Sequence, residues 1–291
     1  MAEPAPAALP AIVFAHANGF PAGTYRRLFE VWRAAGHAVH ALDKFGHDER
    51  YPVTSNWPCL RDELIHFVER EATAPVHLVG HSMGGYLCVL AASRRPDLAC
   101  GVVLLDAPLL GGVVGQVMRF SKATGAVRRF SPGKVSQGRR QRWPDAEAAY
   151  AHFAAKPAFA CWAPEVLRDY IASGIEPQDG GHGLAFRREV ETLIYNTLPH
   201  HIAPLLRRHP LACPMAFVGG TRSVENRQVG LRTTERLTHG RVSMIEGSHL
   251  FPFERPQAAA HAVLGWLRAF AASGGDAREP VAAGTSARKA G

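Results

Sequence analysis

Short apolar segments alternate with amphipathic ones along most of this chain, and that alternation limits the folds open to it more than any other feature. Six apolar segments predict strands, at residues 11–16, 37–42, 76–79, 102–105, 215–218 and 242–245. Helices are predicted between and after them, at residues 25–35, 58–71, 257–271 and from the turn at 80–85 to about residue 94. This order indicates one mostly parallel sheet of about six strands with helices on both faces. The carboxyl ends of such strands share one edge, where ligands bind in open α/β sheets.

Residues 108–211 interrupt the alternation between the fourth and fifth predicted strands. The segment contains no clear strand and is too long for a plain loop in a compact domain. We interpret it as an inserted, mainly helical cap, with helices near residues 145–155, 164–173 and 186–198. The predicted core then consists of residues 10–107 and 212–272. A tail at 273–291, rich in Gly, Ala and Ser, is expected to be disordered.

Composition excludes several classes of protein. With 47% hydrophobic and 20% charged residues, the chain can form a sizeable core. No apolar run approaches the ~20 residues that cross a bilayer, so we expect no stable membrane insertion. The first ten residues lack the basic region of a secretory signal. The cysteines form no CxxC pair, which favours a reducing, cytoplasmic location and offers no zinc-ligand spacing. They are Cys59, Cys88, Cys100, Cys161 and Cys213.

The net charge of +8 comes largely from one stretch of the chain. Residues 119–142 contain eight Lys or Arg residues and no acidic residue. Nucleic-acid binding requires a reading module or stacking aromatic residues beside such a patch, and no such module is evident. We therefore expect no nucleic-acid partner and interpret the stretch as solvated surface. A site for the anionic part of a substrate is the alternative.

The sequence Gly80-His-Ser-Met-Gly-Gly85 stands between a predicted strand and a predicted helix. The G-x-S-x-G pattern in that position predicts a nucleophile at Ser82. Small neighbours permit the strained turn that lifts the serine hydroxyl clear of the sheet. The turn also puts the backbone N–H of Met83 at the start of a helix, where an oxyanion is stabilised. An ordinary Gly-rich turn with an inert serine is the alternative, and the matching context disfavours it.

In these features the chain resembles the α/β-hydrolase superfamily, from about residue 10 to residue 272. The resemblance rests on the motif around Ser82, the loop His16-Ala-Asn-Gly19, the late His249 and the order of the strands. It implies an α/β-hydrolase fold with a cap inserted after the strand that ends at Asp106. It also implies catalysis by a serine, an acid and a histidine. Many members begin with two further antiparallel strands, and this chain has too few residues before its first strand to form them.

His249 is the predicted catalytic base, because it follows the last strand and so lies at the sheet edge where Ser82 stands. The acid is harder to assign. Superfamily members usually carry it just after the penultimate strand, where this chain has Ser223, and a serine cannot stabilise an imidazolium as a carboxylate does. Asp106 is the favoured acid, since some members use the end of the fourth strand. Glu225 is the alternative.

The resemblance also suggests the rest of the site. The second oxyanion donor is expected to be the backbone N–H of Asn18, with Gly19 as the alternative if the register differs by one residue. The substrate pocket is predicted to include Phe20, His81 and Leu250. The implied chemistry needs no cofactor and no metal ion, and the chain contains no HExxH motif, P-loop or GxGxxG unit.

The favoured function is hydrolysis of a carboxylic ester, in a small to medium acyl ester or a lipid ester, through an acyl-enzyme on Ser82. A C–C bond hydrolase, a thioesterase or a perhydrolase would use the same residues, so these reactions stay open. A non-catalytic binding protein of this fold is the alternative of another class, favoured only by the missing acid at Ser223. The expected partner is a small acyl substrate, and the sequence leaves the oligomeric state open.

Overall fold

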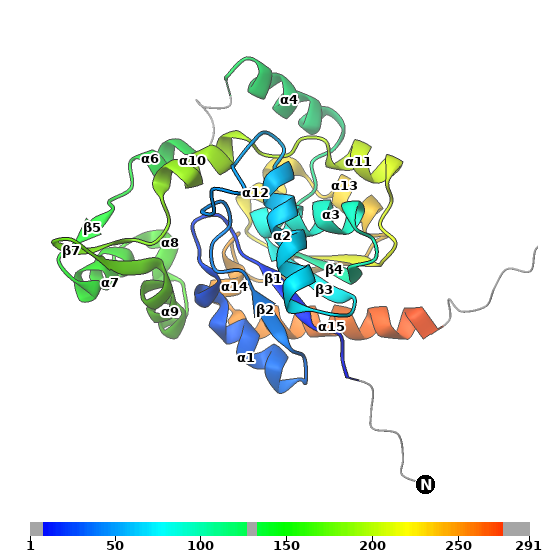
Figure 1. The fold of residues 1–291 in the computed structure, drawn as a ribbon, viewed down its shortest axis with the longest axis horizontal. Helices are drawn as coiled ribbons and strands as arrows, with labels where there is room; N and C mark the ends of the chain where they lie inside the picture. Colours follow the sequence, from blue (N-terminus) through cyan, green and yellow to red (C-terminus); the bar gives the residue numbers. More distant parts are fainter. Residues whose placement is uncertain (1–7, 127–132, 276–291) are drawn as a thin grey trace, which may run out of the picture.

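The main sheet of the protein contains six strands, each parallel to its neighbours, in the order β2-β1-β3-β4-β8-β9 (Figure 1). The structure is a computed structural model and describes residues 8–126 and 133–275. The strands are β1 (Ile12–Ala15), β2 (Val39–Ala41), β3 (Val76–His81), β4 (Ala99–Leu105), β8 (Met215–Gly220) and β9 (Val242–Ile245). The predicted α/β fold with about six parallel strands is confirmed.

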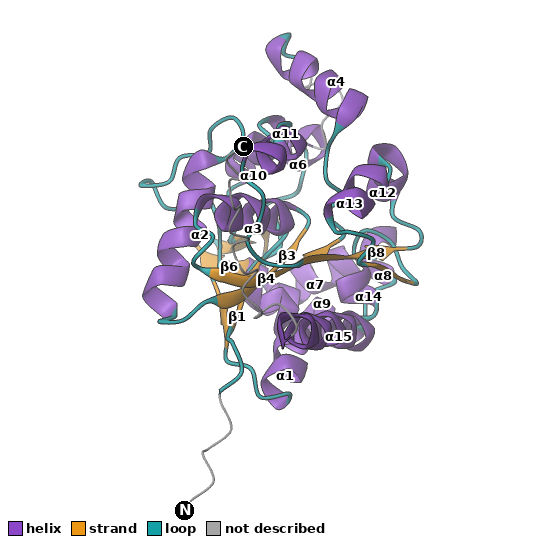
Figure 2. Cartoon of the chain, turned by 90° about the vertical axis from the view of Figure 1, so that its right-hand side faces the viewer, coloured by secondary structure: helices purple, strands orange, loops and turns teal. Residues whose placement is uncertain are grey.

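Successive residues of a strand point to opposite faces of the sheet, so each central strand contributes to two cores. In β1, Ile12 and Phe14 belong to one core, whereas Val13 and Ala15 belong to the other. Helices cover both faces (Figures 1 and 2), which explains why the central strands are apolar throughout. The first core is covered by α1 (Arg26–Ala34) and α15 (Pro256–Gly275), and the second by α2 (Pro58–Glu71) and α3 (Met83–Arg94).

The strand order sets where a ligand crevice forms. The chain passes from β1 to β2 on one side of it and then to β3 on its other side. In an open α/β sheet the ligand crevice forms at such a reversal of strand order, outside the carboxyl ends of the strands, here β1 and β3. Because all six strands are parallel, the loops after β1, β3, β4, β8 and β9 leave the sheet at this edge. Short helices border these loops: η1 (Ala22–Tyr25), α12 (Val224–Val229), α13 (Arg232–Leu237) and α14 (Phe251–Glu254).

The segment between β4 and β8 is mainly helical, but it also contains a small sheet. Three short antiparallel strands pair in the order β5-β7-β6. They are β5 (Arg142–Trp143), β6 (Ile175–Gln178) and β7 (Gly181–Leu184). The expectation that this segment contains no strand is therefore wrong. Proline in β6 and glycines in β7 weaken the strand pattern, although the Asp179-Gly180 pair between them is a recognised hairpin signal.

The same segment carries an aromatic cluster that is continuous with the first core. Trp143, Phe153, Trp162 and Tyr170 are buried in it, whereas Phe120 is 70% exposed on α4, which stands away from the body of the molecule (Figures 1 and 2). Most of these aromatic residues therefore form core. The helices here are α4 (Gly112–Ala123), α6 (Gly133–Gln137), α7 (Ala146–Ala154), α8 (Pro157–Ala160), α9 (Pro164–Gly174), α10 (Arg188–Asn196) and α11 (Ile202–Arg208).

Some predictions fall partly outside the described residues. Helix α15 extends to Gly275, so the first residues of the predicted tail are helical, and residues 276–291 lie outside the described part. Arg128 and Arg129 of the basic stretch lie outside it as well. Among the described helices, none combines the length and apolar character needed to span a membrane. The division of the chain into core and cap stays a prediction.

Candidate active site

Ser82 stands in a sharp turn between β3 and α3, with φ 53° and ψ −114°. Such a backbone conformation is rare for a residue other than glycine and costs free energy. The turn brings the start of α3 against β1, since a Cβ atom on Gly84 would lie 1.9 Å from the carbonyl oxygen of Ala15. Only glycine fits at position 84, which is the physical reason for the small residues around the serine.

His249 follows β9, and its side chain lies beside Ser82. Its Nε2 atom lies 3.0 Å from Oγ of Ser82, within hydrogen-bonding distance. The side chain of His249 is 20% exposed, so the pair is accessible from the surface. The preceding residue, Ser248, donates hydrogen bonds from its backbone N–H and its hydroxyl to the buried carboxylate of Glu254. These bonds fix the loop that carries the histidine.

Asp106 follows β4 with a φ of 42° and is fully buried. Its Oδ2 atom lies 2.7 Å from Nδ1 of His249 and accepts a hydrogen bond of 2.6 Å from the hydroxyl of Ser223. Its Oδ1 atom accepts bonds of 2.6 Å from the Gly220 N–H and 2.8 Å from Nδ2 of Asn226. Four donors therefore hold one carboxylate in a single orientation, with one oxygen directed at the histidine.

The structure brings Asp106 closer to the histidine than Glu225. Oε2 of Glu225 lies 3.7 Å from Nδ1 of His249, and its side chain is 45% exposed. Ser223, at the usual acid position, donates to Asp106 and accepts a bond of 3.1 Å from the Asn226 N–H, which caps α12. Sequence reasoning missed this role. The sequence could have predicted the capping part of this role, because a serine just before the first turn of a helix is a typical N-cap.

Opposing effects act on the pKa of His249. Burial lowers it, whereas the hydrogen bond to Asp106 and the charges of Glu225 and Asp106 raise it, and the net result is a pKa above the ordinary 6.5. The imidazolium form of His249 is thus stabilised. Among the described residues, these three form the one cluster of His and carboxylate ligand atoms within 4.8 Å that could hold a metal ion. That the site needs none stays a prediction.

His81 lies inside the protein rather than in the substrate pocket expected from the sequence. It is fully buried, with Nε2 2.9 Å from the backbone carbonyl oxygen of His249 and Nδ1 2.8 Å from the hydroxyl of Tyr25. Because a carbonyl only accepts, Nε2 carries the proton and Nδ1 accepts from Tyr25. Burial, aided by the neighbouring His249, lowers the pKa of His81 to about 3, so the ring is neutral. Tyr25, which sequence reasoning missed, also accepts from the Ala17 N–H at 3.1 Å.

The loop after β1 forms a tight turn at the expected oxyanion donor. The N–H of Phe20 donates to the Ala17 carbonyl at 3.1 Å, and Gly19 has a φ of 82°. Within the described residues, the backbone N–H groups of Asn18 and Met83 have no hydrogen-bond acceptor. Both are thus free donors at the sheet edge, on loops that β1 and β3 bring together. Their assignment to an oxyanion hole stays a prediction.

The other two predicted pocket residues, Phe20 and Leu250, are half-buried against the first core. The ring of Phe20 lies 5.8 Å from those of Trp162 and Tyr170 and 5.2 Å from that of Phe253, between ring centroids. Both side chains are partly exposed, and they lie on the loops that carry Asn18 and His249. Their position is compatible with a pocket wall, and the role stays a prediction.

The basic stretch at 119–142 is not uniformly solvated, contrary to expectation. The side chain of Arg139 is only 15% exposed and lies 2.7 Å from the carboxylate of Glu191. Nζ of Lys122 donates to the carbonyl oxygen of Leu198 at 2.9 Å, and burial lowers the pKa of this amine to about 8. Tertiary contacts between distant segments therefore neutralise or bury charges that the local sequence presents as surface.

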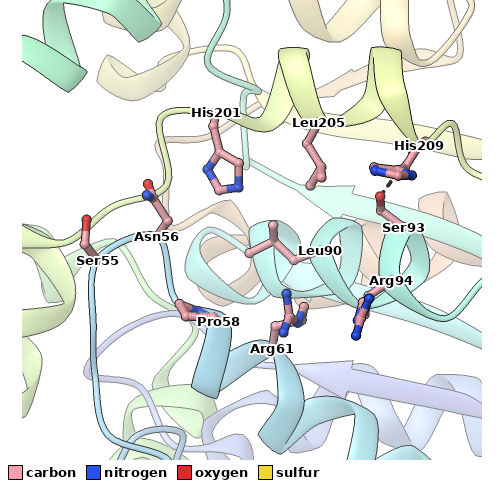
Figure 3. Close-up of a pocket in the computed structure, with 10 residues that line it drawn as sticks. All are labelled: Ser55, Asn56, Pro58, Arg61, Leu90, Ser93, Arg94, His201, Leu205 and His209. Atoms are coloured by element: carbon pink, nitrogen blue, oxygen red, sulfur yellow. Dashed lines mark hydrogen bonds between the residues drawn. The ribbon is translucent and has the colours of Figure 1, made fainter.

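A surface cavity of about 490 Å³ lies between α2, α3 and α11, with the ring of His201 directed into it (Figure 3). Its lining is Ser55, Asn56, Pro58, Arg61, Leu90, Ser93, Arg94, His201, Leu205 and His209. None of the predicted site residues lines it. Leu90 is about 12 Å along α3 from Ser82, at 1.5 Å per residue, so this cavity is separate from the candidate active site.

Comparisons with known proteins agree with this fold. The model of the alpha/beta hydrolase family matches residues 12–262. Monoglyceride lipase of Rattus norvegicus is 35% identical over 108 residues, which are 34% of this chain and 35% of that protein. The monoglyceride lipase homolog of Monkeypox virus is 29% identical over 142 residues, 44% of this chain and 51% of that protein. The matches thus span a third to a half of the length of these curated relatives.

Solved structures resemble the whole fold. The crystal structure of E-2-(acetamidomethylene)succinate hydrolase has a TM-score of 0.72 at 22% identity, covering 89% of this chain and 91% of that one. A thioesterase domain from the curacin biosynthetic pathway has a TM-score of 0.67 at 20% identity, covering 88% and 90%. At such identities the likeness concerns the fold alone. With a family model that matches most of its length and the six-stranded parallel sheet, this chain belongs to the alpha/beta hydrolase family.

Proposed function

We propose that this protein is a serine hydrolase that cleaves carboxylic esters through an acyl-enzyme on Ser82. One observation carries the proposal, namely the two hydrogen bonds that join Ser82 to His249 at 3.0 Å and His249 to Asp106 at 2.7 Å. A hydroxyl, an imidazole and a buried carboxylate in this order form an activated nucleophile. The strained backbone at Ser82 supports the same conclusion, because such strain persists where function requires it.

The proposed reaction has two halves. Oγ of Ser82 attacks the ester carbonyl while Nε2 of His249 accepts the hydroxyl proton, and the N–H groups of Asn18 and Met83 bind the oxyanion. His249 then gives the proton to the leaving alcohol, and the acyl group stays on Ser82. Water attacks this acyl-enzyme with His249 as the base, and the acid product leaves with Oγ reprotonated. Asp106 keeps Nδ1 protonated and stabilises the imidazolium throughout.

The names of relatives support ester substrates. They include monoglyceride lipases and an sn-1-specific diacylglycerol lipase of Mus musculus, 29% identical over 142 residues. We therefore favour a small to medium acyl ester or a lipid ester. A thioester, a C–C bond or a perhydrolysis reaction would use the same residues, and a substrate panel separates these. A purely binding role is disfavoured, because Asp106 supplies the carboxylate that position 223 lacks.

Labelling with a fluorophosphonate tests the proposal. Intact mass and peptide mapping should give one adduct, on Ser82 of the wild type, and none in Ser82→Ala. Asp106→Asn should be labelled far more slowly than the wild type, whereas Glu225→Gln should be labelled at nearly the wild-type rate. A folded wild type that takes no label and hydrolyses no 4-nitrophenyl ester would refute the proposal.

A further inference from the structure

Glu191 of α10, in the inserted segment, contacts the loop that carries the expected oxyanion donor. The carbonyl oxygen of Glu191 accepts a hydrogen bond of 2.9 Å from Nδ2 of Asn18. The carboxylate lies over the next residue of the loop, since a Cβ atom at Gly19 would be 3.0 Å from Oε1 of Glu191. Asn18 is 4% exposed and Glu191 is 4% exposed, so this contact is sealed from solvent.

Arg139 holds the carboxylate of Glu191 in place. Its Nη1 atom donates to both carboxylate oxygens, at 2.9 and 2.7 Å, and its Nη2 atom donates to the hydroxyl of Tyr170 at 2.9 Å. Nη1 would also lie 3.2 Å from a Cβ atom at Gly19. Arg139, two residues after α6, thus links Tyr170 of α9 to Glu191 of α10, and Arg139 and Glu191 lie beside the two loop residues.

The chemistry of these contacts favours positioning over direct catalysis. Both acceptor oxygens of the carboxylate bind one guanidinium, so Glu191 has no role as a free base. A buried ion pair holds its geometry well, but removal of one partner leaves an uncompensated buried charge that disturbs its surroundings. The surroundings here are the turn at Asn18 and Gly19, and in the proposed reaction the N–H of Asn18 must point at the developing oxyanion.

We propose that Glu191 and Arg139 are positioning residues that fix the oxyanion donor of the Asn18 loop. This inference rests on the proposed function. The pair touches neither Ser82 nor His249 in any hydrogen bond or ion pair of the described residues. Its effect is therefore on the alignment of the donor, so a loss of the pair should weaken binding of the transition state more than binding of the ester.

Steady-state kinetics on a 4-nitrophenyl ester, with Arg139→Gln, Glu191→Gln and Arg139→Lys, test the inference. Each neutral single variant should lose about 10- to 100-fold in kcat, since small misalignments cost that much, with KM changed far less. The inhibition constant of a trifluoromethyl ketone, which forms a tetrahedral adduct with the serine, should rise in proportion to the loss in kcat/KM. Arg139→Lys keeps the positive charge but cannot bond to both Glu191 and Tyr170 as the guanidinium does, so its loss in kcat should be smaller.

The double variant Arg139→Gln/Glu191→Gln distinguishes positioning from substrate binding. Two neutral amides leave no buried charge unpaired, so kcat should recover about tenfold over the worse single variant. Arg140→Gln, on the exposed neighbour, is the matched control and should behave as the wild type. The inference is overturned if kcat and the ketone constant are unchanged, or if KM alone rises. An inactive wild type would instead refute the proposed function.

Discussion

Asp106 combines full burial with four hydrogen-bond donors around one carboxylate, and that combination defines its part in the site. A buried carboxylate without such partners would take up a proton and lose its charge. Here Gly220, Ser223 and Asn226 donate hydrogen bonds to the carboxylate, and one of its oxygens faces His249. The carboxylate of Glu225 is nearby but partly exposed, so solvent screens its charge. The two carboxylates therefore act unequally on the imidazole of His249, although both lie near it.

The first prediction compares these carboxylates. Asp106→Asn should lower kcat by about 10⁴-fold, because an amide at this position favours the wrong imidazole tautomer. Glu225→Gln should change kcat/KM by about fivefold at most, as expected for an exposed charge. Both are measured with a 4-nitrophenyl ester at a pH where His249 is neutral. A greater loss in Glu225→Gln than in Asp106→Asn would assign the acid to Glu225.

The second prediction concerns pH. The pKa of His249 is raised above 6.5, and the base acts only when neutral, so kcat/KM should rise with pH through a midpoint above 6.5. Glu225→Gln removes a charge that favours the imidazolium, so the midpoint should move to lower pH. High salt should shrink the difference between the two profiles. Identical midpoints at low salt would show that Glu225 does not act on the histidine.

Local sequence patterns identify some residues of the candidate site and not others. Ser82 and His249 were predictable because each follows a recognisable strand, and parallel strands deliver both to one edge. The choice between Asp106 and Glu225 stayed open, because both follow a strand that ends at that edge. His81 was misassigned to the pocket, since its contacts with Tyr25 and the His249 carbonyl depend on packing that no local pattern reveals.

At the scale of elements, Ser223 connects helix α12 to strand β4. Its hydroxyl accepts the Asn226 N–H as the N-cap of α12 and donates to the carboxylate that follows β4. The start of α12 and the carboxylate of Asp106 are therefore held by the same atom. A carboxylate at position 223 would lie close to that of Asp106, and the two like charges would repel each other. A serine at position 223 is therefore compatible with a carboxylate after β4.

The third prediction follows from this shared atom. Ser223→Ala removes a cap and leaves Asp106 with one donor fewer, so the free energy of unfolding should fall by about 1–3 kcal/mol. The catalytic rate should fall as well, because Asp106 is held less firmly. Urea unfolding and kcat measure the two effects. Ser273→Ala, on an exposed hydroxyl of α15, is the control and should stay within about 0.5 kcal/mol of wild type. An unchanged stability and rate would contradict the role of Ser223.

At the scale of the whole molecule, one core spans the main sheet and the inserted segment. Trp162 of the inserted segment packs on Phe253 of α14 with ring centroids 4.4 Å apart, and the Ala163 N–H donates to the Phe253 carbonyl at 3.1 Å. Phe253 in turn stacks near Tyr25, at 4.8 Å, which bonds to His81. The inserted segment and the loops around Ser82 and His249 are thus parts of one packed unit.

The fourth prediction tests whether the inserted segment and the main sheet unfold together. Trp162→Ala should lower the free energy of unfolding by about 3–5 kcal/mol, the usual cost of a large core truncation. Because the core is continuous, loss of activity and loss of far-UV circular dichroism should coincide in urea, for the wild type and for the variant. Two separate transitions would mean that the inserted segment unfolds on its own and that the shared core contributes little.

The sequence by itself determined the six parallel strands, the elbow at Ser82 and the position of His249, because burial on two faces and a turn that admits only small residues leave local patterns. The sequence did not predict the small sheet of the inserted segment, since proline and glycine weaken the pattern of short strands. Only the tertiary structure decided that Asp106, 143 residues from His249, lies nearest its ring, and that Arg139 reaches the Asn18 loop. Such pairs depend on how distant loops pack at one sheet edge, and that packing has no local period in the sequence.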